Sequence, residues 1–381
     1  MTAPLAIETQ LAQAGCRRDP RTGALSAPIY QTASFAHPAL GQSTGFDYSR
    51  TSNPTRLALE ETLAAAEGGH RGFAFASGLA AIDTVLRLLE AGSRVVVTED
   101  IYGGTFRLFE KAARSFGIEA LYMDTSDTEA VRGALKEPGV RALFIESPTN
   151  PLLKIANLPV LIALARGVGA VTIVDNTFLT PCRQRPLDLG ADLAVYSATK
   201  YLAGHNDVVA GAVVARTSEW SERIAFLQNA VGAVLGPQDS WLALRGLKTL
   251  PLRLKQQEEN AGRIAEWLSR HPRVKRVYYP GLPGHPGHDT LKRQASGFGA
   301  MIAFEVEDAA RVPAILEGVR VFLFAESLGG VESLITYPRV QTHADMASAV
   351  LNRLGIGHNL LRLSVGIENV ADLIRDLENV L

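Results

Sequence analysis

One lysine lies where a long cationic side chain is unusual, just after a short apolar segment. Residues 193–196, Leu-Ala-Val-Tyr, have the pattern of a buried strand, and Lys200 follows with Ser197 and Thr199 on its N-terminal side. An ammonium group beside a buried strand loses hydration unless it is paired or neutralised. Condensation with an aldehyde removes this problem, and the two hydroxyls suit a phosphate. The residues therefore suggest pyridoxal phosphate, with a solvated loop lysine as the alternative.

Two other polar side chains come at the ends of strand-like segments. A carboxylate at Asp175, which ends an apolar run, is costly unless a cation pairs with it, and a protonated pyridine nitrogen would be such a cation. The pairing would keep the pyridine ring electron-withdrawing. The flat ring of Tyr102 would stack well on a pyridine. The alternatives are a helix cap for Asp175 and simple packing for Tyr102.

Two further positions suit anions. The turn Ser77-Gly78-Leu79 joins a strand to a helix and exposes backbone N–H groups at a positive dipole end, although Ser-Gly is also a common cap. Arg362 stands alone among the apolar residues of a strand-like segment, 360–366. A half-buried arginine needs an anion, which is either a substrate carboxylate or an internal salt bridge.

The elements that must position these residues alternate between strand and helix from about 56 to 215. This alternation predicts an α/β fold with a mostly parallel sheet, whose strand ends bind ligands. Because 381 residues exceed the usual size of one domain, a smaller α+β domain is expected to follow. We predict an N-terminal arm at 1–55, a cofactor domain at 56–250 and a C-terminal domain at 251–381.

Individual elements are also predictable. We expect helices at 56–67, from 78 to about 90, and at 257–270, and strands at 72–76, 94–98, 141–146, 170–174, 193–196, 208–216 and 274–279. Residues 225–250 are expected to form a helical connector. The arm has few periodic residues and should pack against something, such as another subunit.

Composition narrows the classes of partner. A net charge of -1 gives no electrostatic reason to expect binding to nucleic acid or to an anionic membrane, so small amino-acid substrates fit better. Cys16 and Cys182 are far apart, and His285 and His288 lack further ligands, so we expect no metal site. No apolar run approaches a membrane span and no basic leader is apparent. The expected location is the cytoplasm.

The stretch 192–206, Asp-Leu-Ala-Val-Tyr-Ser-Ala-Thr-Lys-Tyr-Leu-Ala-Gly-His-Asn, resembles the cofactor-attachment signature of the Cys/Met-metabolism family of pyridoxal-phosphate enzymes. The other motifs follow in family order along nearly the whole chain. The resemblance implies fold type I, the aspartate-aminotransferase-like fold, with Lys200, Tyr102 and Asp175 as the catalytic residues.

The resemblance also implies roles that the residues alone leave open. Tyr48 and Arg50, in a Tyr-x-Arg segment followed by Asn-Pro-Thr, would reach the cofactor phosphate of a neighbouring subunit, usually in a homotetramer of two dimers. On their own they suit a solvent-exposed surface. The turn at Ser77, Gly78 and Leu79 would bind the phosphate of its own subunit, with Leu79 where the family usually has Met.

The same resemblance implies a substrate site. Asn150, otherwise a turn former, would lie near the cofactor ring oxygen and the substrate carboxylate, with Ser327 and Arg362 also at that carboxylate. Glu326 would accept the ammonium at the far end of cysteine or cystathionine.

The choice of reaction depends on fewer residues. Gly104 stands where methionine γ-lyases typically have cysteine, and cystathionine β-lyases of the enterobacterial type usually lack an acid matching Glu326. The segment 326–343 looks most similar to bacterial cystathionine γ-synthases that also act as O-acetylhomoserine thiolases. These features favour γ-replacement on an O-acylhomoserine with cysteine, or with sulfide, and cystathionine γ-lyase is the alternative. A non-catalytic cofactor- or nucleotide-binding α/β protein is the alternative from another class, but it would not explain Lys200 between two hydroxyls.

Overall fold

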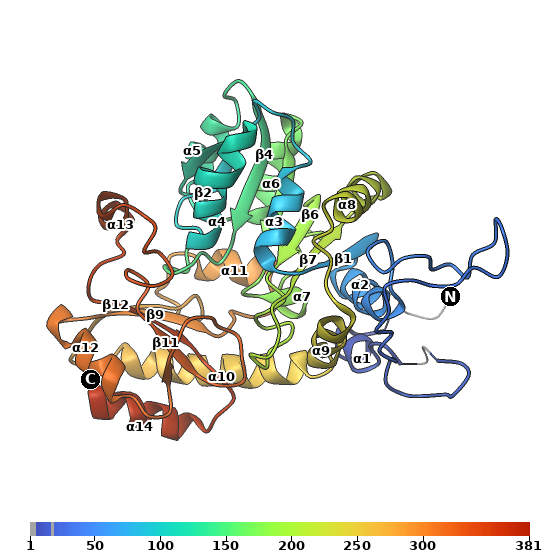
Figure 1. The fold of residues 1–381 in the computed structure, drawn as a ribbon. Helices are drawn as coiled ribbons and strands as arrows, with labels where there is room; N and C mark the ends of the chain where they lie inside the picture. Colours follow the sequence, from blue (N-terminus) through green and yellow to red (C-terminus); the bar gives the residue numbers. More distant parts are fainter. Residues whose placement is uncertain (1–4, 17–18) are drawn as a thin grey trace.

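The computed structural model describes residues 5–16 and 19–381. Its larger part is a seven-stranded sheet (Figure 1). The strands, in spatial order, are β1 (Arg71–Phe75), β7 (Gly211–Ala215), β6 (Leu193–Tyr196), β5 (Val171–Asp175), β4 (Val140–Glu146), β2 (Arg94–Thr98) and β3 (Glu119–Met123). The pairs from β6 to β3 are parallel, and β7 is antiparallel to both β6 and β1. This confirms the mostly parallel sheet predicted from the alternation of elements.

Helices cover both faces of this sheet. One apolar cluster fills the space under α3 (Gly78–Leu86), α8 (Ser218–Val231) and the helical run α4 (Gly103–Arg107), η1 (Leu108–Ala112) and η2 (Ala113–Phe116). Another lies under α2 (Pro54–Glu67), α5 (Thr128–Ala134) and α6 (Leu158–Gly167) and continues into the C-terminal part. Helix α2 starts at Pro54 after an Asn53 cap and ends at Gly68, whose φ of 74° suits glycine.

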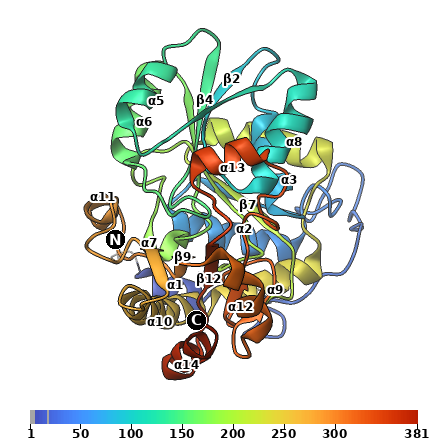
Figure 2. The same cartoon turned by 90° about the vertical axis from the view of Figure 1, so that its left-hand side faces the viewer.

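The C-terminal part is built on a second, five-stranded sheet. Its strands, in spatial order, are β10 (Leu323–Phe324), β11 (Leu334–Thr336), β12 (Leu360–Ser364), β9 (Met301–Val306) and β8 (Val274–Tyr278). The long helix α10 (Leu250–Leu268) packs against β8 and β9 of this sheet, and the terminal helix α14 (Val370–Val380) packs against α10; both lie at the bottom of Figure 2. The remaining helices are α7 (Thr180–Arg183), α9 (Pro237–Leu247), α11 (His288–Gln294), η3 (Ala309–Arg311), α12 (Val312–Gly318) and α13 (Ser348–Leu354).

The first residues are less detached than an arm running from 1 to 55 would be. Helix α1 (Ile7–Ala12) packs on the body of its own chain, with Leu11 buried, and the Trp241 indole donates to the Ala27 carbonyl at 3.0 Å. By contrast, most residues from 29 to 50 are exposed or half-exposed, and the blue chain of Figure 1 extends away from both sheets here. The projecting part of the arm is therefore its second half.

Candidate active site

The main pocket opens where the carboxyl ends of β2, β4, β5 and β6 face the C-terminal part. It is a cavity of about 320 Å³. Most of the residues singled out in the sequence line it: Ser77, Gly78, Leu79, Tyr102, Asn150, Asp175, Ser197, Thr199, Lys200, Glu326, Ser327 and Arg362. Tyr48 and Arg50 do not line it. The predicted convergence at the strand ends is thus present in one chain, apart from the two residues of the arm.

Lys200 lies at the centre of the pocket, in the turn after β6. Its Nζ donates to the Ser327 hydroxyl at 2.8 Å, which joins the large sheet to the C-terminal part. Burial, followed by the charge of Arg362, lowers the Lys200 pKa to about 8, against the opposing charge of Glu326. A substantial fraction of such an amine is neutral near physiological pH, as condensation with an aldehyde requires.

Asp175 is the last residue of β5 and faces the pocket. Thr177 donates both its backbone N–H, at 3.0 Å, and its hydroxyl, at 2.6 Å, to the same carboxylate oxygen, Oδ1. The Thr177 hydroxyl oxygen also accepts the Ser197 N–H at 2.9 Å, which ties the ends of β5 and β6 together. Burial raises the pKa of Asp175, so a cation arriving in the pocket would stabilise its charged form.

The glycine turn before α3 is shaped for an anion. The Ser77 hydroxyl caps the helix by accepting the Ala80 N–H at 3.0 Å, while Gly78 and Leu79 line the pocket. A Cβ added at Gly78 would lie only 3.0 Å from the Cβ of Ser197, so glycine permits this close approach. These positions match the phosphate turn predicted from the sequence.

The two hydroxyls beside Lys200 are not equivalent. Thr199 donates its hydroxyl to the Ala210 carbonyl at 3.1 Å and accepts the Ala210 N–H at 2.9 Å. The Thr199 hydroxyl proton is therefore already donated to a backbone carbonyl. The Ser197 hydroxyl is the better candidate donor to a phosphate.

Arg362 is the buried cation of the site and is only 1% exposed. Its guanidinium donates to Asn150 Oδ1 at 2.8 Å, to the Ser327 carbonyl at 3.0 Å and to the Thr336 hydroxyl at 3.3 Å. These acceptors are all neutral, which favours the carboxylate-binding alternative over an internal salt bridge. Burial lowers the pKa of Arg362 to about 10, which leaves the guanidinium charged at neutral pH.

The neighbours of Arg362 are held in place. The Asn150 carbonyl accepts a hydrogen bond from His343 Nε2 at 2.9 Å, and burial lowers the His343 pKa to about 4, so this ring is neutral. Ser327 has a φ of 87°, a left-handed conformation that is strained for serine. The strained backbone directs the Ser327 carbonyl at Arg362 and its hydroxyl at Lys200.

The structure adds one acidic residue that the sequence interpretation missed. Glu146 ends β4 in register with Asp175 on β5, and it lines the pocket. Its Oε2 accepts the Tyr102 N–H at 3.1 Å, while its buried Oε1 has no partner among the described residues. Burial, followed by the charge of Asp175, raises the Glu146 pKa well above its ordinary value, which favours the protonated form of this carboxyl. Glu146 could have been found from the sequence because it ends the strand predicted at 141–146.

Tyr48 and Arg50 lie outside the pocket of their own chain. Tyr48 is 44% exposed and the Arg50 guanidinium lies 5.5 Å from the centre of its ring. Arg50 also donates to both the carbonyl and the side chain of Asn229. Both residues are exposed on the surface of the described chain.

The pocket fits pyridoxal phosphate on these observations. The glycine turn and Ser197 suit the phosphate, Asp175 suits a pyridinium nitrogen, and Lys200 suits the aldehyde. Among residues 5–16 and 19–381, no cluster of three or more histidine, cysteine, aspartate or glutamate side chains could hold a metal ion. The same described residues include no helix that is both long and apolar enough to span a membrane.

Comparison with known proteins agrees with this fit. Residues 8–381 match the family model described as Cys/Met metabolism PLP-dependent enzyme. A cystathionine γ-lyase of Bacillus subtilis (strain 168) is 49% identical over 374 residues, which cover 98% of each chain. A cystathionine β-lyase of Lactococcus lactis subsp. cremoris (strain MG1363) is 49% identical over 375 residues, again 98% of each chain.

A solved structure extends the similarity to the fold. The crystal structure of a cystathionine γ-synthase from Xanthomonas oryzae pv. oryzae, in complex with aminoacrylate and cysteine, matches with a TM-score of 0.97 at 45% identity. The match covers 99% of this chain and 97% of the other. The three relatives thus carry three different activities at similar identity.

Proposed function

The chain belongs to the Cys/Met-metabolism family of pyridoxal-phosphate-dependent enzymes, and we propose that within this trans-sulfuration family it is a cystathionine γ-synthase. The proposed reaction joins the thiol of cysteine to Cγ of an O-acylhomoserine and releases the carboxylic acid of the ester. The products are cystathionine and that acid. Sulfide is proposed as a second thiol.

The binding residues orient the substrate. Arg362, with Asn150 and Ser327, would bind the α-carboxylate of the O-acylhomoserine. The phosphate turn at Ser77, Gly78 and Leu79, with Ser197, would hold the cofactor at its other end. When bound, pyridoxal phosphate supplies an aldehyde that links to an amine and a ring that withdraws electrons from the bond broken at Cα.

The reactive residues move and hold protons. Lys200 would remove the proton from Cα and, as it lies within the same cavity, exchange a proton at Cβ so that the ester group can leave Cγ. Asp175 would hold the proton of the pyridine nitrogen, and Tyr102 would pack on the ring face.

The position of Glu326, in the segment 326–343 that looks most similar to bacterial cystathionine γ-synthases, is the observation that supports γ-replacement. Glu326 lies in the pocket close enough to influence both Lys200 and Arg362 electrostatically. Arg362 is proposed to bind the first substrate, which leaves Glu326 for the ammonium of an incoming cysteine. The second candidate is cystathionine γ-lyase, favoured by the similarity to the Bacillus subtilis protein.

We also propose that the active site is shared. Tyr48 and Arg50 are exposed and outside their own pocket, as expected if they contact the cofactor phosphate of a neighbouring subunit. The minimum working unit is then a dimer, and we propose a homotetramer of two dimers in the cytoplasm. We also propose a domain boundary at 250/251, within the first turn of α10.

Product analysis tests the reaction. The cofactor-loaded protein is incubated with O-acetylhomoserine plus cysteine and, separately, with cystathionine alone. Cystathionine from the first mixture supports γ-replacement. Formation of only cysteine, 2-oxobutanoate and ammonia from cystathionine would make the enzyme a γ-lyase, whereas homocysteine and pyruvate would make it a β-lyase.

A further inference from the structure

The backbone of the exposed segment 48–50 accepts hydrogen bonds from a buried arginine. Arg56, in the first turn of α2, donates through Nη1 to the Ser49 carbonyl at 2.7 Å and through Nη2 to the Arg50 carbonyl at 3.2 Å. Arg56 is only 2% exposed, whereas Tyr48 and Arg50 are exposed. One planar guanidinium therefore fixes two consecutive peptide groups of the arm.

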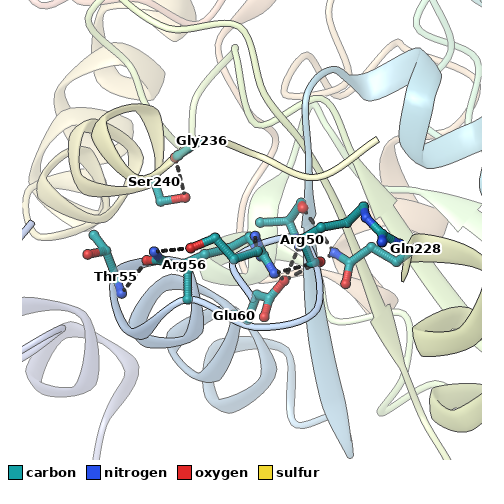
Figure 3. Close-up of polar contacts among 10 residues, drawn as sticks. Arg50, Thr55, Arg56, Glu60, Gln228, Gly236 and Ser240 are labelled. Carbon is teal, nitrogen blue, oxygen red and sulfur yellow. Dashed lines mark hydrogen bonds and ion pairs between the residues drawn. The ribbon is translucent and has the colours of Figure 1, made fainter. Parts of the chain in front are cut away.

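The arginine is itself anchored to the large sheet. Its Nε lies 3.4 Å from Glu60 Oε1, one turn further along α2. Glu60 in turn accepts the backbone N–H of Ala74 in β1 at 2.9 Å and the Gln228 amide of α8 at 3.2 Å. Figure 3 shows Arg56 and Glu60 near the centre of these contacts, with Arg50 and Gln228 to their right.

This arrangement links the arm to the rigid core and not to its own pocket. A buried ion pair is by itself weak evidence of stabilisation, because the cost of desolvating both charges offsets their attraction. The hydrogen bonds that Arg56 donates, however, go to the Ser49 and Arg50 carbonyls, which belong to the projecting segment of the arm. Neither Arg56 nor Glu60 lines the main pocket.

We propose that Arg56 is a positioning residue that acts in trans: it holds Tyr48 and Arg50 of one subunit at the angle needed to reach the cofactor phosphate of the neighbouring subunit. The proposal rests on the shared active site proposed above. Glu60 and Gln228 fix the arginine, and Arg56 fixes the backbone of the arm. Arg56 thus serves the site of the neighbouring subunit and not the pocket of its own chain.

Hybrid assemblies test the direction of this effect. Two differently tagged chains are co-expressed and isolated through both tags, and activity and bound cofactor, by visible absorbance, are measured. In the hybrid of Arg56→Met with Lys200→Ala, one site combines an intact Lys200 with an intact arm, so about half of the normal activity and cofactor is expected. In each dimer that pairs a wild-type chain with the double variant R56M/K200A, no site has both, and the activity of these mixed dimers should fall at least about tenfold.

A purely structural role predicts the reverse order. If Arg56 served only the core of its own subunit, the first hybrid would be impaired and the second would retain the intact site of the wild-type chain. That outcome would overturn the proposal. Should Arg56→Met reduce the yield of folded protein, Arg56→Lys keeps a charge beside Glu60 but cannot donate to both carbonyls in one plane, and the same order is expected.

Arg50→Ala separates this inference from the shared site itself. The same two hybrids are prepared with Arg50→Ala in place of Arg56→Met. If both variants act in trans, the shared site and the role of Arg56 are supported together. If Arg50→Ala acts in trans but Arg56→Met acts in cis, only the positioning role fails; if Arg50→Ala acts in cis, the shared site fails as well.

Discussion

Lys200 combines two properties that a surface lysine lacks: a buried amine and a hydroxyl partner. Burial disfavours its ammonium form, Arg362 disfavours it further, and Glu326 partly restores it, giving a pKa of about 8 in place of 10.5. Only the neutral amine attacks an aldehyde. The chemistry of the residue is therefore set by the elements that bury it.

The first prediction concerns the uptake of the cofactor by the apoprotein. Since the neutral fraction of Lys200 rises with pH up to its pKa, the rate of covalent incorporation of pyridoxal phosphate should rise about tenfold per pH unit below about pH 8 and then level off. Stopped-flow absorbance measures this rate. Glu326→Gln, which removes the opposing negative charge, should shift the midpoint to lower pH. A midpoint near 10.5 would contradict the buried environment.

The second prediction concerns the role proposed for Glu326. Replacing its carboxylate by an amide in Glu326→Gln removes the charged partner of the cysteine ammonium, so KM for cysteine should rise roughly ten- to a hundredfold. Sulfide carries no ammonium and provides the internal control: KM for sulfide should change little. Steady-state kinetics with both thiols measures this difference, and an equal loss with both would assign Glu326 another role.

Among elements, the start of α4 determines where the ring of Tyr102 lies. The Tyr102 N–H is held by Glu146 at the end of β4, and Gly104 lies against the ring. A Cβ at Gly104 would lie 2.4 Å from Cε1 of Tyr102, too close for any real contact. The lack of a side chain at Gly104 therefore leaves the space that the Tyr102 ring occupies.

The third prediction follows from this contact. Gly104→Ala should displace the ring of Tyr102, weaken binding of the cofactor and lower kcat/KM about tenfold, while the melting temperature stays nearly unchanged because alanine favours a helix. Gly133→Ala in α5 is the matched control, since a Cβ there meets no atom within 4 Å. Cofactor titration and kinetics compare the two. Equal behaviour of both variants would show that the ring has room to move.

Elements with strong local signals were predicted closely from the sequence. Strands β2 and β6 have the predicted bounds, and α2 ends at Gly68 as expected. Helix α10 begins at Leu250 and not at the predicted 257, because tertiary packing overrides the weak helix signal of its Pro-containing first turn. Helix α3 ends at Leu86, before the predicted Glu90.

The site was predictable where chemistry depends on residue type and strand position, as for Lys200 and Asp175. Three features of the site could not be predicted from the sequence. The commitment of the Thr199 hydroxyl to Ala210 and the strained backbone at Ser327 depend on contacts between distant segments. The raised pKa of Glu146 depends on burial and on the register of β4 against β5, which one sequence does not reveal.

At the scale of the whole molecule, the pocket lies between the part built on the seven-stranded sheet and the C-terminal part built on the five-stranded sheet. Lys200, after a strand of the large sheet, donates a hydrogen bond to Ser327 of the C-terminal part. Arg362 of the C-terminal part donates one to Asn150, which follows another strand of the large sheet. The contacts proposed for Arg50 would add a second chain. Cofactor binding should therefore be coupled to the assembly of subunits.

The last prediction is this coupling. If Tyr48 and Arg50 of one subunit contact the cofactor phosphate of another, the dimer must bind pyridoxal phosphate more tightly than the monomer. By thermodynamic linkage the cofactor must then tighten the dimer by this factor for each of its two sites, and hence by the square of the factor when both sites are filled. Sedimentation velocity over a dilution series, with and without cofactor, measures this tightening, and the factor per site should be at least about tenfold for a charge-assisted contact. Arg50→Ala should abolish most of the difference while leaving the apoprotein dimer intact. Equal dissociation constants for the apoprotein and the loaded enzyme would mean that each pocket binds its cofactor without its neighbour.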